Sequence, residues 1–198
     1  MSTKDTPNKK PEIRFKEANL AFLDLETTGM DPKHHEIIEI GVVIARQVKR
    51  EGRGPSLELI DELDIKVKPT HIETAQPVAL KINKYRQEDW LFAVPLETAL
   101  LELNKKAKGA VLIAQNITFD WGFLEAAYQK TRLPFGLHPK RKLDTIALAF
   151  ALLYDDPNMQ KFSLHHLCQR YGVENRRAHT ALSDARAIFG IYKKMFDA

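Results

Sequence analysis

The chain has one cysteine among its 198 residues, Cys168, so it can form neither an intramolecular disulfide bond nor a zinc site built from several thiolates. It also has no apolar run that approaches the ~20 residues a transmembrane helix needs, and no basic segment followed by an apolar one opens it. We therefore expect a soluble protein of a reducing, cytoplasmic compartment, with no membrane partner.

What the chain has is enough length for one domain with a real core, and a slight excess of positive charge. Its 30 lysines and arginines outnumber its 26 acids, which gives a formal net charge of +4. Mild basicity fits a polyanionic partner without requiring one. The basic residues gather in four places, at residues 8–16, 46–53, 138–142 and 175–177. We expect residues 1–17 to form a basic, flexible tail and residues 18–198 to form the folded domain.

Hydrophobic periodicity predicts an α/β fold with a mixed sheet. Three strands come first, near residues 18–24, 37–45 and 57–67, with connections that suit an antiparallel meander. Helical and extended segments then alternate: a helical region at 77–90, a helix at 95–107, a strand at 110–114, a helix at 118–130, a strand at 142–144, and helices at 145–153, 163–172 and 180–196. Strands followed by such an alternation imply a sheet with helices packed on its faces.

Two carboxylates lie two positions apart in the first predicted strand. The side chains of Asp24 and Glu26 therefore point to one face, roughly 6 to 7 Å apart along the strand. Unpaired carboxylates this close repel each other and resist desolvation. Either the strand ends in solvent at the turn formed by Thr28 and Gly29, or a cation neutralises the pair, and this stretch alone leaves both readings open.

Two further acids lie on the apolar stripes of predicted helices. Asp120 shares a helix face with Phe123, Leu124 and Ala127, and Asp184 lies within the stripe of the last helix. Three separate elements that each carry an acid toward the interior are better explained by a shared cation than by independent accidents. Four oxygen ligands suit a hard divalent ion such as Mg²⁺ or Mn²⁺.

His179 is the candidate proton acceptor beside these acids. It precedes Asp184 by five positions, roughly 140° around a helix, so both face one site only if His179 lies just before the helix. An isolated histidine at such a place more often contacts only solvent. Beside a metal-binding acid cluster, however, an imidazole that titrates near neutral pH suits the activation of a water molecule.

The segments DLETTG (24–29), NITFD (116–120) and HTALSDA (179–185) resemble, in order, the three motifs of the DEDDh, or DnaQ-like, 3′-5′ exonucleases. The resemblance runs from about residue 18 to residue 196, and within the family it is closest to the proofreading epsilon subunit of bacterial DNA polymerase III. It implies an RNase H-like fold, a mixed five-stranded sheet flanked by helices. Gln115 departs from the family pattern, because many relatives have histidine before the second motif.

The resemblance also implies an activity, the hydrolysis of phosphodiester bonds at the 3′ end of single-stranded DNA with release of nucleoside 5′-monophosphates. The four acids would hold two Mg²⁺ or Mn²⁺ ions, which act on the attacking and leaving oxygens, and His179 would take a proton from the attacking water. Contacts to the terminal nucleotide would come from Thr27, Thr28 and Asn116.

Two other functions stay open at this point. The protein could be an exoribonuclease, because such a site reads a 3′ end and a phosphate more than a base. It could also be a non-catalytic, polymerase-associated nucleic-acid-binding subunit, although the four intact acids and His179 argue against this. The sequence ends at Ala198, without the long tail that the epsilon subunit uses to bind its polymerase, which favours a stand-alone enzyme or a truncated chain. A DNA polymerase remains a candidate partner.

Overall fold

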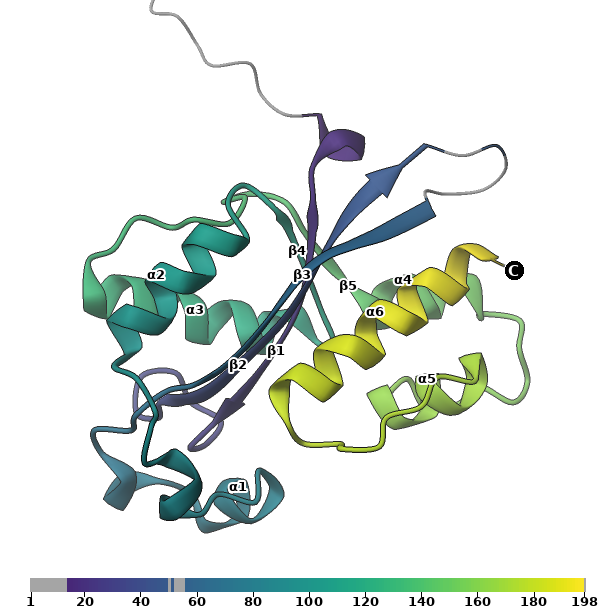
Figure 1. Cartoon of the computed structure of the whole chain (residues 1–198). Coiled ribbons are helices and arrows are strands. Elements are labelled where there is room, and N and C mark those ends of the chain that lie inside the picture. Colours follow the sequence, from purple (N-terminus) through teal and green to yellow (C-terminus); the bar gives the residue numbers. More distant parts are fainter. Residues whose placement is uncertain (1–13, 50, 52–55, 198) are drawn as a thin grey trace, which may run out of the picture.

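The computed structural model describes residues 14–49, 51 and 56–197 (Figure 1). The predicted basic tail lies mostly outside these ranges, but its last residues, Phe15–Glu17, form a 3-10 helix. Part of the basic cluster at 46–53 also lies outside them. Within the described ranges, no helix is both long and apolar enough to cross a lipid bilayer.

A five-stranded sheet forms the centre of the fold, in the order β3-β2-β1-β4-β5. Its strands are β1 (Leu20–Thr27), β2 (Ile37–Val48), β3 (Ser56–Lys66), β4 (Val111–Ala114) and β5 (Lys142–Asp144). The first three strands pair antiparallel, as the predicted meander requires, whereas β4 pairs parallel with both β1 and β5. The predicted mixed sheet is confirmed.

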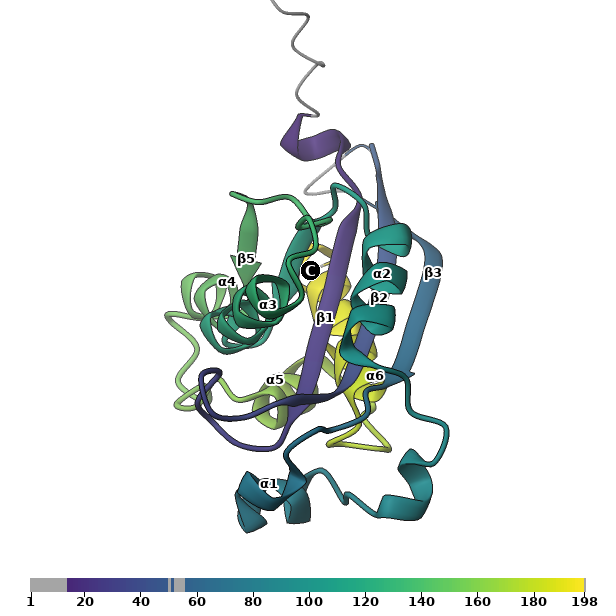
Figure 2. The ribbon, with the colours of Figure 1, turned by 90° about the vertical axis from the view of Figure 1, so that its left-hand side faces the viewer.

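Helices cover both faces of this sheet (Figures 1 and 2). One face carries α2 (Leu96–Lys106) and α3 (Ile117–Thr131), and the other carries α6 (Ala181–Asp197). Behind α6 lie α4 (Thr145–Leu152) and α5 (Leu164–Tyr171), which share a smaller core with it. Because both faces are covered, β1 and the first part of β2 are buried almost throughout.

Alternate residues of β1 pack into different cores. Leu23 and Leu25 pack with residues of α2 and α3, whereas Leu20 and Phe22 pack against α6. Since side chains alternate along a strand, Asp24 and Glu26 continue the series that faces α6. The first strand extends through Thr27, beyond the predicted end, so these acids lie within the strand and not at a solvated end.

The structure differs from the sequence prediction in two other places. The helical region predicted at 77–90 is two short helices, α1 (Pro77–Ile82) and a 3-10 helix at Gln87–Trp90, separated by a turn in which Lys84 has a φ of 53°. The second strand continues to Val48, because its polar end still pairs with β3. Its backbone hydrogen bonds continue beyond the apolar residues from which the strand was predicted.

Candidate metal and active site

The four predicted acids come from β1, α3 and α6, and the sheet brings these elements together. Asp24 lies opposite Gly41 of β2, and a Cβ atom at Gly41 would lie 2.0 Å from the carbonyl carbon of Ala181. The first turn of α6 therefore rests directly on the backbone of β2, which only a glycine permits. This close approach brings Asp184, which lies in the same first turn of α6, to the face that carries Asp24 and Glu26.

Asp184 and His179 are joined through the turn that precedes α6. The backbone N–H of His179 donates a hydrogen bond of 3.1 Å to Oδ2 of Asp184, and the amide nitrogen of Asn175 donates to Oδ1. His179 has a φ of 68°, so it lies outside the helix, as the five-residue spacing requires. Both residues also line a cavity of about 710 Å³ against α5.

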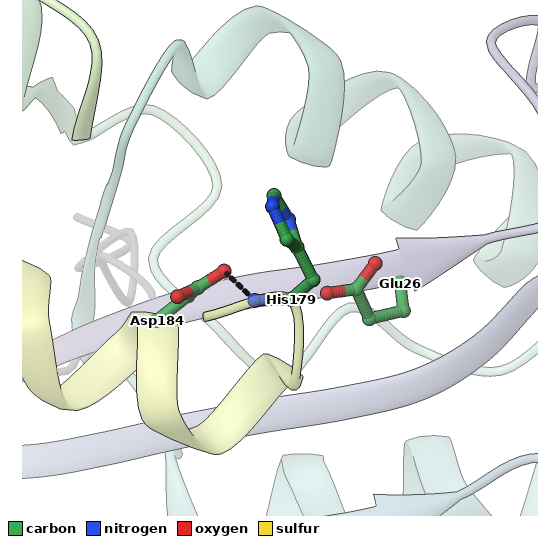
Figure 3. A group of neighbouring side chains, drawn as sticks. All are labelled: Glu26, His179 and Asp184. Carbon is green, nitrogen blue, oxygen red and sulfur yellow. Dashed lines mark hydrogen bonds between the residues drawn. The ribbon is translucent and has the colours of Figure 1, made fainter. Parts of the chain in front are cut away.

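Glu26, His179 and Asp184 form a compact group of possible metal ligands among the described residues. One ligand atom of each lies within 4.8 Å of those of the other two. Figure 3 shows the two carboxylates on either side of the histidine. Glu26 and Asp184 are buried, whereas His179 is exposed at the rim. The acids thus form the floor of the site and the imidazole its edge.

Asp120 reaches the same place from the first turn of α3. It is 3% exposed, and its Oδ1 accepts a hydrogen bond of 3.1 Å from the backbone N–H of Leu25, between the two acids of β1. The carboxylate of Asp144 holds the start of α3 by accepting from the backbone N–H groups of Asn116 and Ile117, and it also caps α4. One carboxylate therefore fixes two helix starts, and through α3 it fixes Asp120.

Burial raises the pKa of every acid in the cluster. It raises the pKa of Asp24 well above its ordinary value, with further repulsion from Asp120 and Asp184. Burial, and then repulsion from Asp184, raises the pKa of Glu26 to about 8, and burial raises that of Asp120 to about 8. The pKa of Asp184 is also raised by burial, although hydrogen bonds from Asn175 and His179 oppose this shift. Such a cluster of hard oxygen donors, destabilised by its own charge, fits divalent cations.

The residues predicted to contact the substrate, Thr27, Thr28 and Asn116, differ in their exposure and in their hydrogen bonds within the protein. Thr28 is buried and its hydroxyl accepts a hydrogen bond of 2.8 Å from the backbone N–H of Glu36, while the hydroxyl of Thr27 donates to the carbonyl of Gly29. These hydroxyls close the loop after β1. Asn116, in contrast, is exposed at the start of α3 with a φ of 59°. Contacts of all three residues with a nucleotide remain predictions.

Sequence reasoning missed three polar residues near the site. Glu39 lies opposite Glu26 in the sheet, is 4% exposed, and accepts a hydrogen bond from the backbone N–H of Ala181. Asn175 orients Asp184, and Lys84 lowers the pKa of both Glu26 and Asp184. Glu39 could have been found as the one acid in the apolar run IIEIGVV, whereas nothing in the sequence marks Asn175 or Lys84.

An RNase H-like α/β fold with a buried carboxylate cluster suited to divalent cations is the class that this geometry defines. Residues 21–192 match the RNase_T family, which is described as "Exonuclease". The chain belongs to this exonuclease family, and the predicted DnaQ-like resemblance is confirmed. Membership places the chain among the nucleases, which are hydrolases.

Relatives in sequence include DNA polymerase III PolC-type proteins. The protein of Streptococcus thermophilus (strain ATCC BAA-491 / LMD-9) is 31% identical over 189 residues, which cover 93% of this chain and 12% of the relative. That of Thermotoga maritima is 30% identical over 191 residues, which cover 96% of this chain and 13% of the relative. The chain therefore matches only a small part of these much longer proteins.

Solved structures of exonuclease I share the fold. The E. coli enzyme in complex with a dA16 oligonucleotide superposes with a TM-score of 0.72 at 17% identity, over 91% of this chain and 42% of that one. The exonuclease I of Methylocaldum szegediense gives a TM-score of 0.70 at 16% identity, over 91% of this chain and 40% of that one. The five-stranded sheet and its flanking helices are thus those of a known nuclease fold.

Proposed function

We propose that the protein is a metal-dependent 3′-5′ exonuclease that releases nucleoside 5′-monophosphates from single-stranded DNA. The observation that carries this proposal is the convergence of Asp24, Glu26, Asp120 and Asp184 from three elements, with His179 at the rim. A DNA substrate is supported by the similarity to DNA polymerases and by the shared fold with an enzyme solved on a DNA oligonucleotide. The same similarity makes a DNA polymerase the proposed protein partner.

Asp24, Glu26, Asp120 and Asp184 would hold two Mg²⁺ or Mn²⁺ ions. When bound, such a pair stabilises the attacking and leaving oxygens of an in-line displacement at phosphorus. The chain's own contribution is to fix the carboxylates. Asp120 is held by the backbone of Leu25, and Asp184 is held by Asn175 and by the backbone of His179. Burial keeps bulk water from competing for their oxygens.

His179 would take the proton of the attacking water at a ring nitrogen. Its backbone is bound to Asp184, so the imidazole cannot move far from the acid floor, while its exposed ring can meet a water above the cluster. Asn116, together with the loop of Thr27 and Thr28, would contact the terminal nucleotide. Transfer of the proton to His179 leaves the oxygen ready to attack the phosphorus in line with the leaving 3′ oxygen.

The direct test is the digestion of matched DNA and RNA single strands, each labelled at either the 3′ or the 5′ end. With Mg²⁺ or Mn²⁺, 3′-labelled DNA should release labelled mononucleotide at once, whereas 5′-labelled DNA should give a ladder that shortens with time. Asp24→Asn should abolish both signals, and Asp61→Asn, which changes an acid of β3 that pairs with Lys106, should not. Full activity in EDTA, or cutting of circular single strands, would contradict the proposal.

A further inference from the structure

Lys84 occupies an unusual position at the end of α1. The helix ends in two backbone hydrogen bonds, from the N–H of Tyr85 to the carbonyl of Leu80 and from the N–H of Lys84 to the carbonyl of Lys81. This pair of hydrogen bonds is typical of a helix end at which one residue adopts the left-handed conformation. Here that residue is Lys84, which has a φ of 53°. Glycine is the usual residue there, because a side chain is strained in that conformation. A lysine at such a position suggests that its side chain is used.

The turn that carries Lys84 is fixed to the end of β1. Asn83 is 7% exposed, and its amide nitrogen donates a hydrogen bond of 2.7 Å to the carbonyl of Thr27. Thr27 directly follows Glu26, so the turn lies beside the acid cluster. This contact joins residues that are 56 positions apart in the sequence. It holds the backbone from which Lys84 extends.

From this anchored turn, Lys84 reaches the other side of the site. Its Nζ donates a hydrogen bond of 3.4 Å to the carbonyl of Ala178, the residue immediately before His179. Its positive charge also opposes, as a minor contribution, the rise that burial causes in the pKa of Glu26 and of Asp184. The turn of Asn83 and Lys84 therefore connects the end of β1 with the turn that carries His179.

Residues with a positive φ gather around the same place. Among the described residues other than glycine, Lys84, Asn116, Arg132 and His179 have this conformation. Asn116 and His179 are candidate site residues, and only Arg132 lies away from the site, at the far end of α3. Strained backbone conformations concentrate at functional sites, where the surrounding structure maintains them. By this criterion Lys84 belongs with the rim residues.

We propose that Lys84 is a positioning residue for the nuclease reaction: its ammonium group holds the carbonyl of Ala178 and thereby fixes the turn that presents His179 to the acid cluster. The inference rests on the proposed function, since it acts through the proposed proton acceptor. His179 is exposed and sits on a turn, so core packing does not fix its place. The hydrogen bond of 3.4 Å from the Lys84 ammonium group to the adjacent carbonyl supplies a restraint from outside the turn itself.

Three variants test whether the positive charge at position 84 is what matters. Lys84→Met keeps the aliphatic chain and should lower the single-turnover rate at saturating DNA and metal by roughly 10-fold, because His179 loses its alignment. Lys84→Arg restores a cationic donor and should stay within about 3-fold of wild type, with KM little changed in both. Lys81→Met, an exposed lysine one turn earlier in α1, should leave the rate unchanged. Equal rates for wild type and Lys84→Met would overturn the proposal.

The double variant tests whether Lys84 acts through His179. If it does, Lys84→Met should cause almost no further loss in a His179→Ala background, because the group it positions is gone. The same roughly 10-fold loss in both backgrounds would show that Lys84 acts on the substrate independently of His179, and it would overturn the positioning role.

A structural measurement tests the tether without any nuclease assay. Amide hydrogen exchange at residues 178–180 should be faster in Lys84→Met than in wild type, with the rest of α6 unchanged. The matched control for the backbone is Arg132→Gly, which like Lys84→Gly places glycine at a left-handed helix end. Both glycine variants should keep or raise the melting temperature, but only Lys84→Gly should speed exchange in the His179 turn. Unchanged exchange in both Lys84→Met and Lys84→Gly would overturn the proposal. This result does not depend on which nuclease activity the protein has.

Discussion

The acid floor of the site and its rim are held in place by different parts of the structure. Asp24 and Glu26 lie within a central strand, and Asp120 and Asp184 lie in the first turns of helices packed on the sheet. The rim, defined as His179, Asn116 and Lys84, consists of exposed residues on turns with positive φ. The floor therefore forms only when the core folds, whereas the rim can be altered while the fold persists. Variants of the two regions should differ in how activity and stability change together.

A floor variant should give the largest loss of activity without loss of stability. Asp24→Asn removes a ligand charge, so activity should fall to the detection limit of a single-turnover assay and Mn²⁺ affinity should drop in calorimetric titrations. The metal-free protein should keep or raise its melting temperature, because burial and four neighbouring acids disfavour the charged form of Asp24. Asp61→Asn serves as the control. A metal-free protein that becomes much less stable would show that Asp24 has a structural role instead.

A rim variant should lose turnover and nothing else. His179→Ala should lower the single-turnover rate by roughly 10²- to 10⁴-fold, the usual scale for a general base, while metal affinity stays near wild type. Because His179 has a φ of 68°, His179→Asn is the better-matched second variant, since asparagine tolerates that conformation. Both should melt like the wild type. Near-wild-type chemistry in either variant would show that another group accepts the proton.

A third variant should affect stability and activity together, because the contact between β2 and the first turn of α6 supports both the floor and the rim. A Cβ at Gly41 would lie 2.0 Å from the carbonyl carbon of Ala181 and 2.1 Å from the nitrogen of Leu182. Gly41→Ala must displace the first turn of α6, so it should lower the melting temperature and also reduce turnover by about 10²-fold.

Gly122→Ala in α3 is the control for that variant. Its Cβ would meet only Pro32, at 3.7 Å, so activity should persist and helix propensity should keep or raise the melting temperature. If Gly41→Ala matched Gly122→Ala in both stability and rate, the contact between β2 and α6 would not position the site.

The same contrast between floor and rim explains how much the sequence could predict. Asp120 and Asp184 were found because an acid on an apolar helical stripe breaks a pattern, and the mixed sheet follows from strands succeeded by alternating helices and strands. The position of His179 outside the helix followed from its spacing to Asp184. Hydrophobic periodicity reveals these features because residues that pack in the core must recur at the spacing of the helix or strand that carries them.

Other features depend on contacts between distant residues, which no local pattern contains. Asn83 meets Thr27 across 56 positions and Lys84 meets Ala178 across 94. The end of β1 was placed too early, because pairing of Glu26 with Glu39 continues the strand past the apolar run. Lys84 is the rim residue that such long-range contacts fix, so it could be identified only in the structure, whereas His179 and Asn116 were predicted from the sequence.

The smallest expected effect is a pH dependence of stability that belongs to the floor alone. Glu26 has a pKa of about 8 in the folded protein, above the ordinary value of 4.5, so between these values the folded state binds more protons than the unfolded state. The resulting stabilisation is fully present below about pH 4 and is lost as the pH rises through about 8. Asp120, also with a pKa of about 8, acts in the same direction.

Urea unfolding in EDTA should therefore show stability that falls from pH 5 to pH 8. Glu26→Gln cannot ionise, so it should match wild type near pH 4, exceed it at pH 8 and show a shallower slope, whereas His179→Asn should keep the wild-type slope below pH 6. Parallel profiles for wild type and Glu26→Gln would show that Glu26 ionises in the folded protein as it does in the unfolded chain.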